Sequence, residues 1–125
     1  MSIVLASSDG RTLAVNAWNW GVLHHLVASA VVLPDPVWEP KRSGGGGDLD
    51  ADQVAALAAF LADTVLPRLG DGERMFFDGT ITDVPDDGTF YRDEAEMWKN
   101  YSLRRDVLVG VIEFLRRAGG AVAFR

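Results

Sequence analysis

The stretch IVLASSDGRTLAV, residues 3–15, predicts a β-hairpin, and the rest of the fold can be built outward from it. A two-residue turn would pair Leu5 with Ala14, whereas a three-residue loop with a left-handed Gly10 pairs Leu5 with Leu13. The second register gathers the large apolar side chains on one face: Ile3, Leu5, Leu13 and Val15. Because a slip of one residue would divide this face, we expect the three-residue loop.

The residues that follow the hairpin predict a helix and then a loop. Asn16 is placed to cap a helix that runs from residue 17 to about Val32. Pro34 and the prolines after it end the helix, because proline lacks the backbone N–H that a helix needs. We expect a Pro/Gly-rich loop at residues 34–48.

Two further helices are predicted by their end signals. Asp50 and Gln53 have the spacing of a capping box. They precede an apolar stripe made of Val54, Leu57, Ala58, Leu61 and Val65. Ser102 is placed to cap a last helix that runs to about Ala118, where Gly119 provides the stop.

The remaining apolar segments predict strands and complete an α+β fold. Residues 74–82 indicate a strand that is broken or turned at Asp78-Gly79, and residues 121–124 indicate a closing strand. We therefore expect a small, mostly antiparallel sheet of the N-terminal hairpin, the central strand and the C-terminal strand, covered by three helices. The length of 125 residues indicates one domain, residues 1–125.

The composition limits the class of protein. The chain carries a net charge of −6 and contains no cysteine, which removes disulfides and thiolate chemistry. A protein this acidic is repelled by nucleic-acid phosphates, so no nucleic-acid partner is expected. The sequence shows no signal peptide and no apolar run long enough to span a bilayer. We expect a cytoplasmic protein with no membrane partner.

The distribution of charge gives the leading functional hypothesis. Residues 71–96 hold nine acidic and two basic side chains, a net charge of −7, while residues 99–125 have a net charge of +4. Tryptophan and tyrosine, which dominate the energetics of protein interfaces, accompany the acids. We expect a non-enzymatic interaction module that binds an unidentified protein partner, or a second copy of itself as a homodimer. Its acidic-aromatic contact surface would include Asp83, Asp86, Asp87, Trp98 and Tyr101.

The first predicted helix supports an alternative hypothesis. Asn16, Trp20 and His24 recur at a spacing of four residues and so lie on one helical face. A small hydrolase or ligand-binding protein could have its pocket there, between Trp20, His24 and the acidic segment. Trp38, in the proline-rich loop, is a further candidate contact residue, and residues 34–40 offer an apolar loop for homodimerisation.

Established catalytic and metal-binding patterns are incomplete in this sequence. Asp48, Asp50 and Asp52 open like a calcium-binding loop, but the glycine and the glutamate that the loop requires are missing. The glycines at 44–47 precede no Gly-Lys-Ser/Thr motif, and no G-x-S-x-G motif occurs. A metal held by His24 with carboxylates of Asp78 or Asp83 has no spacing motif behind it. We expect no cofactor, no metal and no catalytic residue.

The overall layout of the chain resembles small uncharacterised bacterial α/β proteins of unknown function. The resemblance is carried by Asn16-Ala17-Trp18, by the glycine-rich loop before a capped helix, by FFDGTIT at residues 76–82, and by FLRRAGG at residues 114–120. It covers most of the chain. The resemblance implies a bacterial source but no activity, cofactor or catalytic residue.

Overall fold

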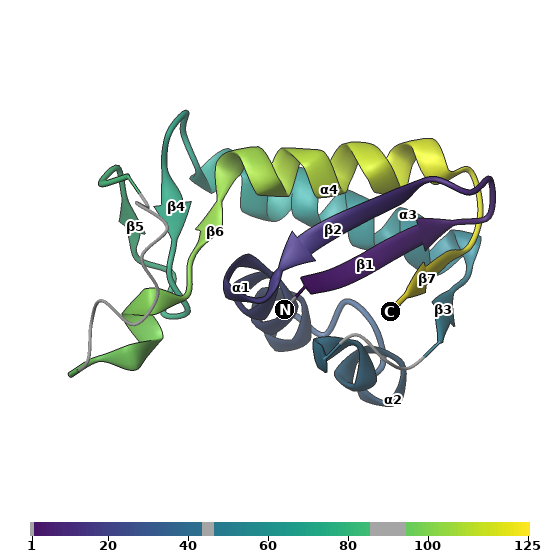
Figure 1. Ribbon diagram of the computed structural model, residues 1–125, viewed down its shortest axis with the longest axis horizontal. Helices are drawn as coiled ribbons and strands as arrows, with labels where there is room; N and C mark the ends of the chain where they lie inside the picture. Colours follow the sequence, from purple (N-terminus) through teal and green to yellow (C-terminus); the bar gives the residue numbers. More distant parts are fainter. Residues whose placement is uncertain (1, 44–46, 86–94) are drawn as a thin grey trace.

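The computed structural model describes residues 2–43, 47–85 and 95–125, which form an α+β arrangement of antiparallel sheets and helices (Figure 1). The strands in this part of the chain are β1 (Ser2–Ser7), β2 (Thr12–Asn16), β3 (Asp48–Leu49), β4 (Arg74–Met75), β5 (Ile81–Thr82), β6 (Leu103–Arg104) and β7 (Val122–Phe124). Its α-helices are α1 (Ala17–Ser29), α2 (Asp35–Trp38), α3 (Ala51–Phe60) and α4 (Arg105–Ala118). Shorter helical segments are η1 (Glu39–Ser43), η2 (Leu61–Val65), η3 (Leu66–Arg68) and η4 (Met97–Asn100).

The N-terminal hairpin belongs to a four-stranded antiparallel sheet with the strand order β2-β1-β7-β3. Its predicted register is confirmed, because Leu5 pairs with Leu13 across a three-residue loop. Gly10 closes the loop at φ = +91°, a backbone conformation that glycine adopts without strain. The closing strand β7 is also confirmed, and it pairs with the other edge of β1, where Phe124 lies opposite Leu5. β1 is therefore an interior strand of this sheet.

The segment expected as the central strand of that sheet lies in a second sheet instead. Residues 74–82 fold into a short hairpin, β4 and β5, and β6 completes a separate three-stranded sheet of order β5-β4-β6 (Figure 1). The turn at Asp78-Gly79 is confirmed, because Gly79 has φ = +85° and the Asp78 carboxylate accepts the Thr80 backbone N–H at 3.0 Å. Only the placement of the central strand was wrong, because β4 pairs with β5 and with residues 103–104 and not with a strand of the large sheet.

Helix α1 begins at its predicted cap and ends before its predicted end near Val32. The Asn16 side chain accepts the backbone N–H of Asn19 at 2.9 Å. At the other end, Val31 has φ = +52°, and the N–H groups of Val31 and Val32 bond back to the carbonyls of Ala28 and Val27. This is the Schellman pattern of helix termination, with valine at the left-handed position that glycine usually occupies.

We expect the substitution Val31→Gly to stabilise the protein. The left-handed conformation costs a β-branched residue about 1–2 kcal/mol, and the added freedom of glycine in the unfolded chain offsets part of the gain. The Val31 side chain is 70% exposed, so its removal loses little buried apolar surface. Urea denaturation should show a free energy of unfolding about 0.5–1 kcal/mol higher. The control is Ala30→Gly, because the neighbouring Ala30 has ordinary helical geometry, and this substitution should lower the free energy of unfolding. If both substitutions lowered the free energy of unfolding equally, this account of the helix end would be wrong.

Residues 34–48 contain more regular structure than the predicted loop. α2 and η1 occupy residues 35–43, with Pro36 in the first helical turn. Proline suits that position because its fixed φ matches the helix and its missing N–H would have had no helical partner. The abundance of proline therefore indicated a helix start here rather than an irregular flap.

Helix α3 confirms the predicted capping box and apolar stripe. The Asp50 carboxylate accepts the Gln53 N–H at 2.8 Å, and the Gln53 side chain accepts the Asp50 N–H at 3.0 Å. The apolar stripe is buried along its whole length: Val54, Leu57, Ala58, Leu61 and Val65.

Helix α4 starts later than expected, and Ser102 does not cap it. Arg104 occupies the N-cap position without a side-chain cap, because residues 103–104 pair with β4 as strand β6. Ser102 is buried and accepts a hydrogen bond from Arg74 Nη1 at 3.1 Å. The predicted stop is confirmed by Gly119, which has φ = +66°.

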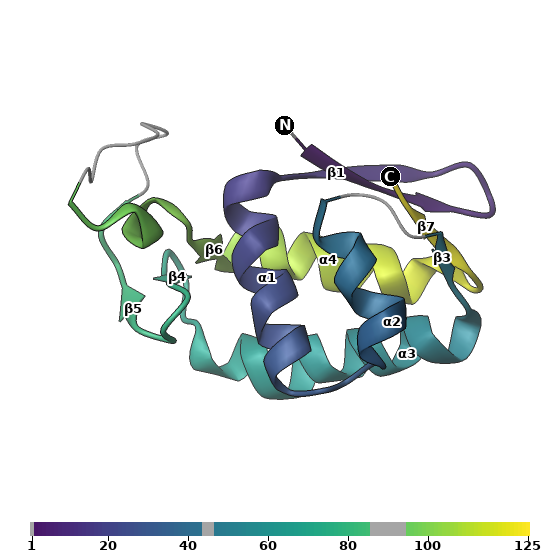
Figure 2. The ribbon, with the colours of Figure 1, turned by 90° about the horizontal axis from the view of Figure 1, so that it is seen from below.

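The helices connect and cover the two sheets. α4 leads from β6 in the small sheet to β7 in the large sheet and lies beside α3 (Figure 1). Figure 2 shows α1 and α2 running across the direction of α3 and α4. The three expected covering helices correspond to α1, α3 and α4, and α2 is additional. No helix in the described ranges is long and apolar enough to cross a membrane.

Candidate functional site

A cleft of about 610 Å³ lies along α1 and brings together several residues that the sequence singled out. We call it the aromatic cleft and define it by six ring-bearing side chains: Trp20, His24, His25, Phe77, Trp98 and Tyr101. Glu39, Arg42 and Ser43 line it from η1. Four of the predicted site residues, Trp20, His24, Trp98 and Tyr101, therefore share one cavity, although they come from both ends of the chain.

Gly21 of α1 faces two of the rings on the other side of the cleft. A Cβ atom at residue 21 would lie 3.4 Å from Phe77 Cζ and 3.4 Å from Tyr101 Cδ2. Glycine inside a helix costs about 0.5–1 kcal/mol relative to alanine. At these distances an alanine Cβ would make ordinary van der Waals contact with both rings, so the rings leave room for alanine at residue 21.

A row of ring contacts forms the wall of the cleft. The Tyr101 ring centroid lies 4.4 Å from that of Trp18 and 5.4 Å from that of Phe77. Phe77 in turn meets the exposed His25 edge-on at 5.5 Å. Trp98 is 36% exposed and meets Phe76 edge-on at 5.9 Å. The rings support one another, which holds the wall in a defined shape.

His24 and Trp38 are bound to each other reciprocally behind the cleft. Their rings stack at 4.8 Å with an interplanar angle of 8°. Trp38 Nε1 donates to the His24 carbonyl at 3.0 Å, and His24 Nε2 lies 2.9 Å from the Trp38 carbonyl. Because a carbonyl can only accept, His24 Nε2 carries a proton. Trp20 Nε1 similarly donates to the Lys41 carbonyl at 2.9 Å, so three ring N–H groups fasten α1 to α2 and η1.

This arrangement changes the roles expected for Trp38 and His24. Trp38 is only 1% exposed, so it belongs to the core and cannot serve as a surface contact residue. His24 is 3% exposed. Burial lowers the pKa of the His24 imidazole below its usual value of 6.5, while the hydrogen bond to Trp38 and the charge of Glu39 act in the opposite direction. A neutral His24 with Nε2 engaged is suited to fastening helices, and Nε2 cannot act as a base while it holds that proton.

The pH dependence of stability should report on His24. The unfolded chain takes up the His24 proton more readily than the folded protein, so this contribution to stability is full above about pH 6.5 and is lost as the pH falls below it. Urea denaturation at pH 7.5, 6.5 and 5.5 should show a decline that His24→Gln flattens. His25→Gln is the matched control and should keep the decline. Equal pH slopes for wild type and His24→Gln would contradict the assignment.

The acidic members of the predicted contact surface lie outside the cleft or outside the described residues. Asp83 is exposed beyond the end of β5 and does not line the cleft. Asp86 and Asp87 fall outside the residues that the structure describes. Within the described ranges, no three His, Asp or Glu side chains are grouped so that they could hold a metal ion, and this includes His24 with Asp78 and Asp83.

Several residues that shape the site were missed in the sequence. Phe77 was read only as part of a strand, and Gly21 only as a helical residue. Asn19 is 1% exposed and holds the start of α4 to α1, because its Oδ1 accepts the Arg104 N–H at 2.8 Å. Lys41 is buried, its Nζ donates to the Val37 carbonyl at 2.9 Å, and burial lowers its pKa. The sequence feature that could have pointed to this site was Gly21, a glycine within the predicted helix that follows Trp18 and Trp20.

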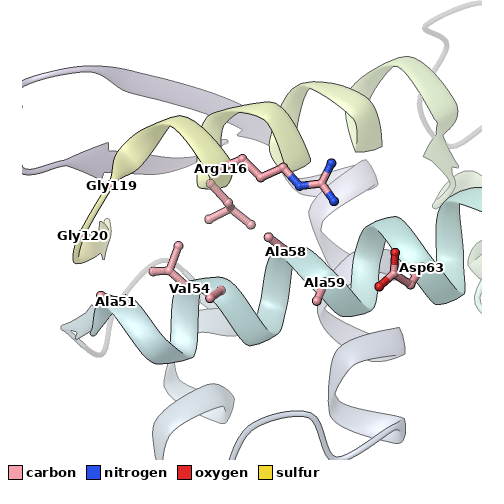
Figure 3. A pocket seen from close by; sticks show the side chains of 10 residues that line it. Ala51, Val54, Ala58, Ala59, Asp63, Arg116, Gly119 and Gly120 are labelled. Atoms are coloured by element: carbon pink, nitrogen blue, oxygen red, sulfur yellow. The ribbon is translucent and has the colours of Figure 1, made fainter.

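Two other hollows offer less chemistry than the aromatic cleft. A groove of about 450 Å³ runs between α3 and α4 and is lined mainly by alanine and glycine (Figure 3). Its charged side chains are Asp63 and Arg116. A hollow of about 360 Å³ beside β4 and the start of α4 is lined by Arg104, Arg105 and Asp106 among others, and these side chains form ion pairs, Arg104 with Asp106 and Arg105 with Asp71.

Fold and site together define a small α+β protein with an aromatic cleft between its first helix and the segment that contains Phe77, Trp98 and Tyr101. Comparison of this chain with protein-family models, with curated proteins and with solved structures found no significant match. The resemblance to bacterial proteins of unknown function therefore stays a prediction, and function has to be inferred from the site.

Proposed function

We propose that this protein is a non-enzymatic interaction module that binds a partner in the aromatic cleft. The observation that carries the proposal is that Trp98 and Tyr101 line the same cavity as Trp20 and His24. The aromatic members of the expected contact surface thereby share one cavity with the residues of the expected pocket. A protein partner is the primary expectation, and a second copy of the chain is the alternative partner.

The size and lining of the cleft support binding. Ligand sites are typically about 300–1,000 Å³, largely apolar, and carry a few polar groups that set orientation. The cleft has a volume of about 610 Å³ and an aromatic lining. Its polar side chains at η1 are Glu39, Arg42 and Ser43. Exposed tryptophan in such a setting often supplies a large part of the binding energy, which points to Trp98 as the main contact residue.

The state of His24 favours binding over catalysis at this site. The hydrolase alternative needs a base with a free nitrogen near a nucleophile. His24 Nε2 donates to the Trp38 carbonyl, which leaves only Nδ1 to act as a base, and the ring is 3% exposed and stacked on Trp38. His24 therefore supports the alternative of a ligand-binding pocket more than that of a hydrolase.

A peptide-display selection against the folded protein tests the proposal. We expect selected peptides to lose about 30-fold in affinity with Trp98→Ala, the effect of removing a contact worth about 2 kcal/mol. Ile81→Ala is the matched control, because Ile81 is 37% exposed against 36% for Trp98 and does not line the cleft. Ser43→Trp, which adds bulk at the cleft, should also block binding.

The outcomes of that selection separate the cleft from the rest of the surface. Peptides that bind both cleft variants as tightly as wild type would overturn the proposal. Circular dichroism and thermal melting of each variant establish that the fold is retained. Sedimentation of wild type and Ser43→Trp tests the homodimer, because a self-associated form that uses the cleft should dissociate in the variant.

A further inference from the structure

We infer that the aromatic cleft takes a cationic side chain, lysine or arginine, from a basic segment of a protein partner. This inference rests on the proposed function and names the chemistry of its ligand. It is drawn from three features of the described residues: the rings that line the cleft, the acids that adjoin them, and the state of the basic groups in the cleft.

The rings provide the first feature. Phe77, Trp98 and Tyr101 line the cleft together, and Trp98 is partly exposed. The face of an aromatic ring is electron-rich and attracts a cation held within about 6 Å of its centre. Such contacts contribute about 0.5–1 kcal/mol at exposed sites and more where the cation loses water. Several rings in one cavity can also cover the apolar stem of a long basic side chain.

The surrounding charge provides the second feature. The chain has a net charge of −6, and the described residues around Phe77 and Trp98, 71–85 and 95–96, hold five acidic side chains and one basic one, a net charge of −4. Asp78 and Glu96 are both exposed and lie next to Phe77 and close to Trp98 in the sequence. Glu39 adds a carboxylate within the cleft lining. A field of this sign draws cations toward the site and repels anions.

The basic groups of the cleft provide the third feature. Arg42 is the cation that an anionic ligand would use, but its Nη1 lies 3.4 Å from Glu39 Oε1 in an exposed ion pair. His24 is engaged with the Trp38 carbonyl. The exposed His25 has its ring edge-on to Phe77. An anion would compete with Glu39 for Arg42, and a cation would compete with Arg42 for Glu39, so this pair favours neither charge. The ring faces, which attract only a cation, then decide the preference.

Three probes of similar size and different charge test the inference: butylammonium, which is the lysine side chain, neutral butan-1-ol and anionic pentanoate. The readout is the movement of the Trp98 indole N–H signal and of the Phe77 and Tyr101 ring signals in NMR titrations. We expect butylammonium to bind about two- to fivefold more tightly than butan-1-ol. Its binding should weaken as salt rises from about 20 mM to about 500 mM.

Variants assign the effect to the cleft. Trp98→Leu keeps an apolar side chain but removes the ring face, and it should abolish the preference for the cation. Glu39→Gln should reduce the preference, while Glu113→Gln, an exposed acid on α4 outside the cleft, is the matched control and should not.

The results distinguish this inference from the proposed function. Equal binding of butylammonium and butan-1-ol, or a preference for pentanoate that Arg42→Gln removes, would overturn the cation but leave the cleft as a binding site. No movement of cleft signals with any probe, while selected peptides still bind there, would also overturn the inference alone. If no probe moved the cleft signals and no selected peptide depended on the cleft for binding, both the inference and the proposed function would be overturned.

Discussion

Trp38→Ala should lower the free energy of unfolding by about 3–5 kcal/mol, the usual cost of removing a buried large aromatic side chain. Trp38 is 1% exposed, stacks on His24, and contacts the rings of Trp20 and Phe124 at centroid distances of 5.8 and 6.1 Å. Its loss removes that packing and leaves a cavity. Because the free energy of unfolding of small proteins is only about 5–15 kcal/mol, this one substitution should remove a large part of the protein's stability.

Two comparison variants separate the contributions of Trp38. Trp38→Phe keeps a ring but loses the N–H that donates to the His24 carbonyl, so we expect a smaller loss of about 1–3 kcal/mol. Trp98→Ala removes a partly exposed ring and should cost less than either substitution. Urea denaturation followed by circular dichroism measures all three. A Trp38→Ala protein within about 1 kcal/mol of wild type would show that α2 does not pack on α1 as described.

Asn19→Ala should lower the free energy of unfolding by about 1–3 kcal/mol, although Asn19 does not line the cleft. Its Oδ1 accepts the Arg104 N–H at 2.8 Å, and its Nδ2 donates to Asn16 Oδ1 at 3.0 Å. Alanine removes the acceptor and leaves the Arg104 N–H without one. The bond joins α1 to β6, so its loss should also loosen the small sheet.

Asn16→Ala is the control for this second prediction. It removes the helix cap and the acceptor of Asn19 Nδ2, at a cost of about 1–2 kcal/mol, but keeps Asn19 Oδ1 as the acceptor for the Arg104 N–H. Hydrogen exchange of the Arg104 amide supplies a local readout. The amide should be protected in wild type and in Asn16→Ala, and should exchange faster in Asn19→Ala. Protection that persists in Asn19→Ala would mean that the bond does not hold α4 to α1.

The features that could be predicted from the sequence are those set by residues close together in the chain. The hairpin register followed from the alternation of apolar residues around Gly10, and the capping box of α3 from Asp50 and Gln53. The division into two sheets could not be predicted, because it depends on β4 pairing with residues 103–104, which the sequence indicated as the start of a helix. The same long-range pairing, of β6 with β4, removed Ser102 from the role of a cap.

The same distinction between local and long-range features applies to the candidate site. The helical spacing of Trp20 and His24 was sufficient to place both on one side of the cleft. The opposite side was not predictable, because Phe77 reaches Gly21 of α1 only through the fold of the second sheet. Trp38 was placed at the surface in error, since an aromatic residue in a proline-rich segment carries no local sign of its burial.

The position of β1 inside the large sheet has a consequence for how the protein is made. β1 spans residues 2–7, but β7, which covers one of its edges, spans residues 122–124. During synthesis on the ribosome, the hairpin can form early, yet one edge of β1 stays uncovered until β7 has emerged. An open strand edge of this kind can pair with another nascent chain, and repulsion between chains that each carry a net charge of −6 opposes that pairing.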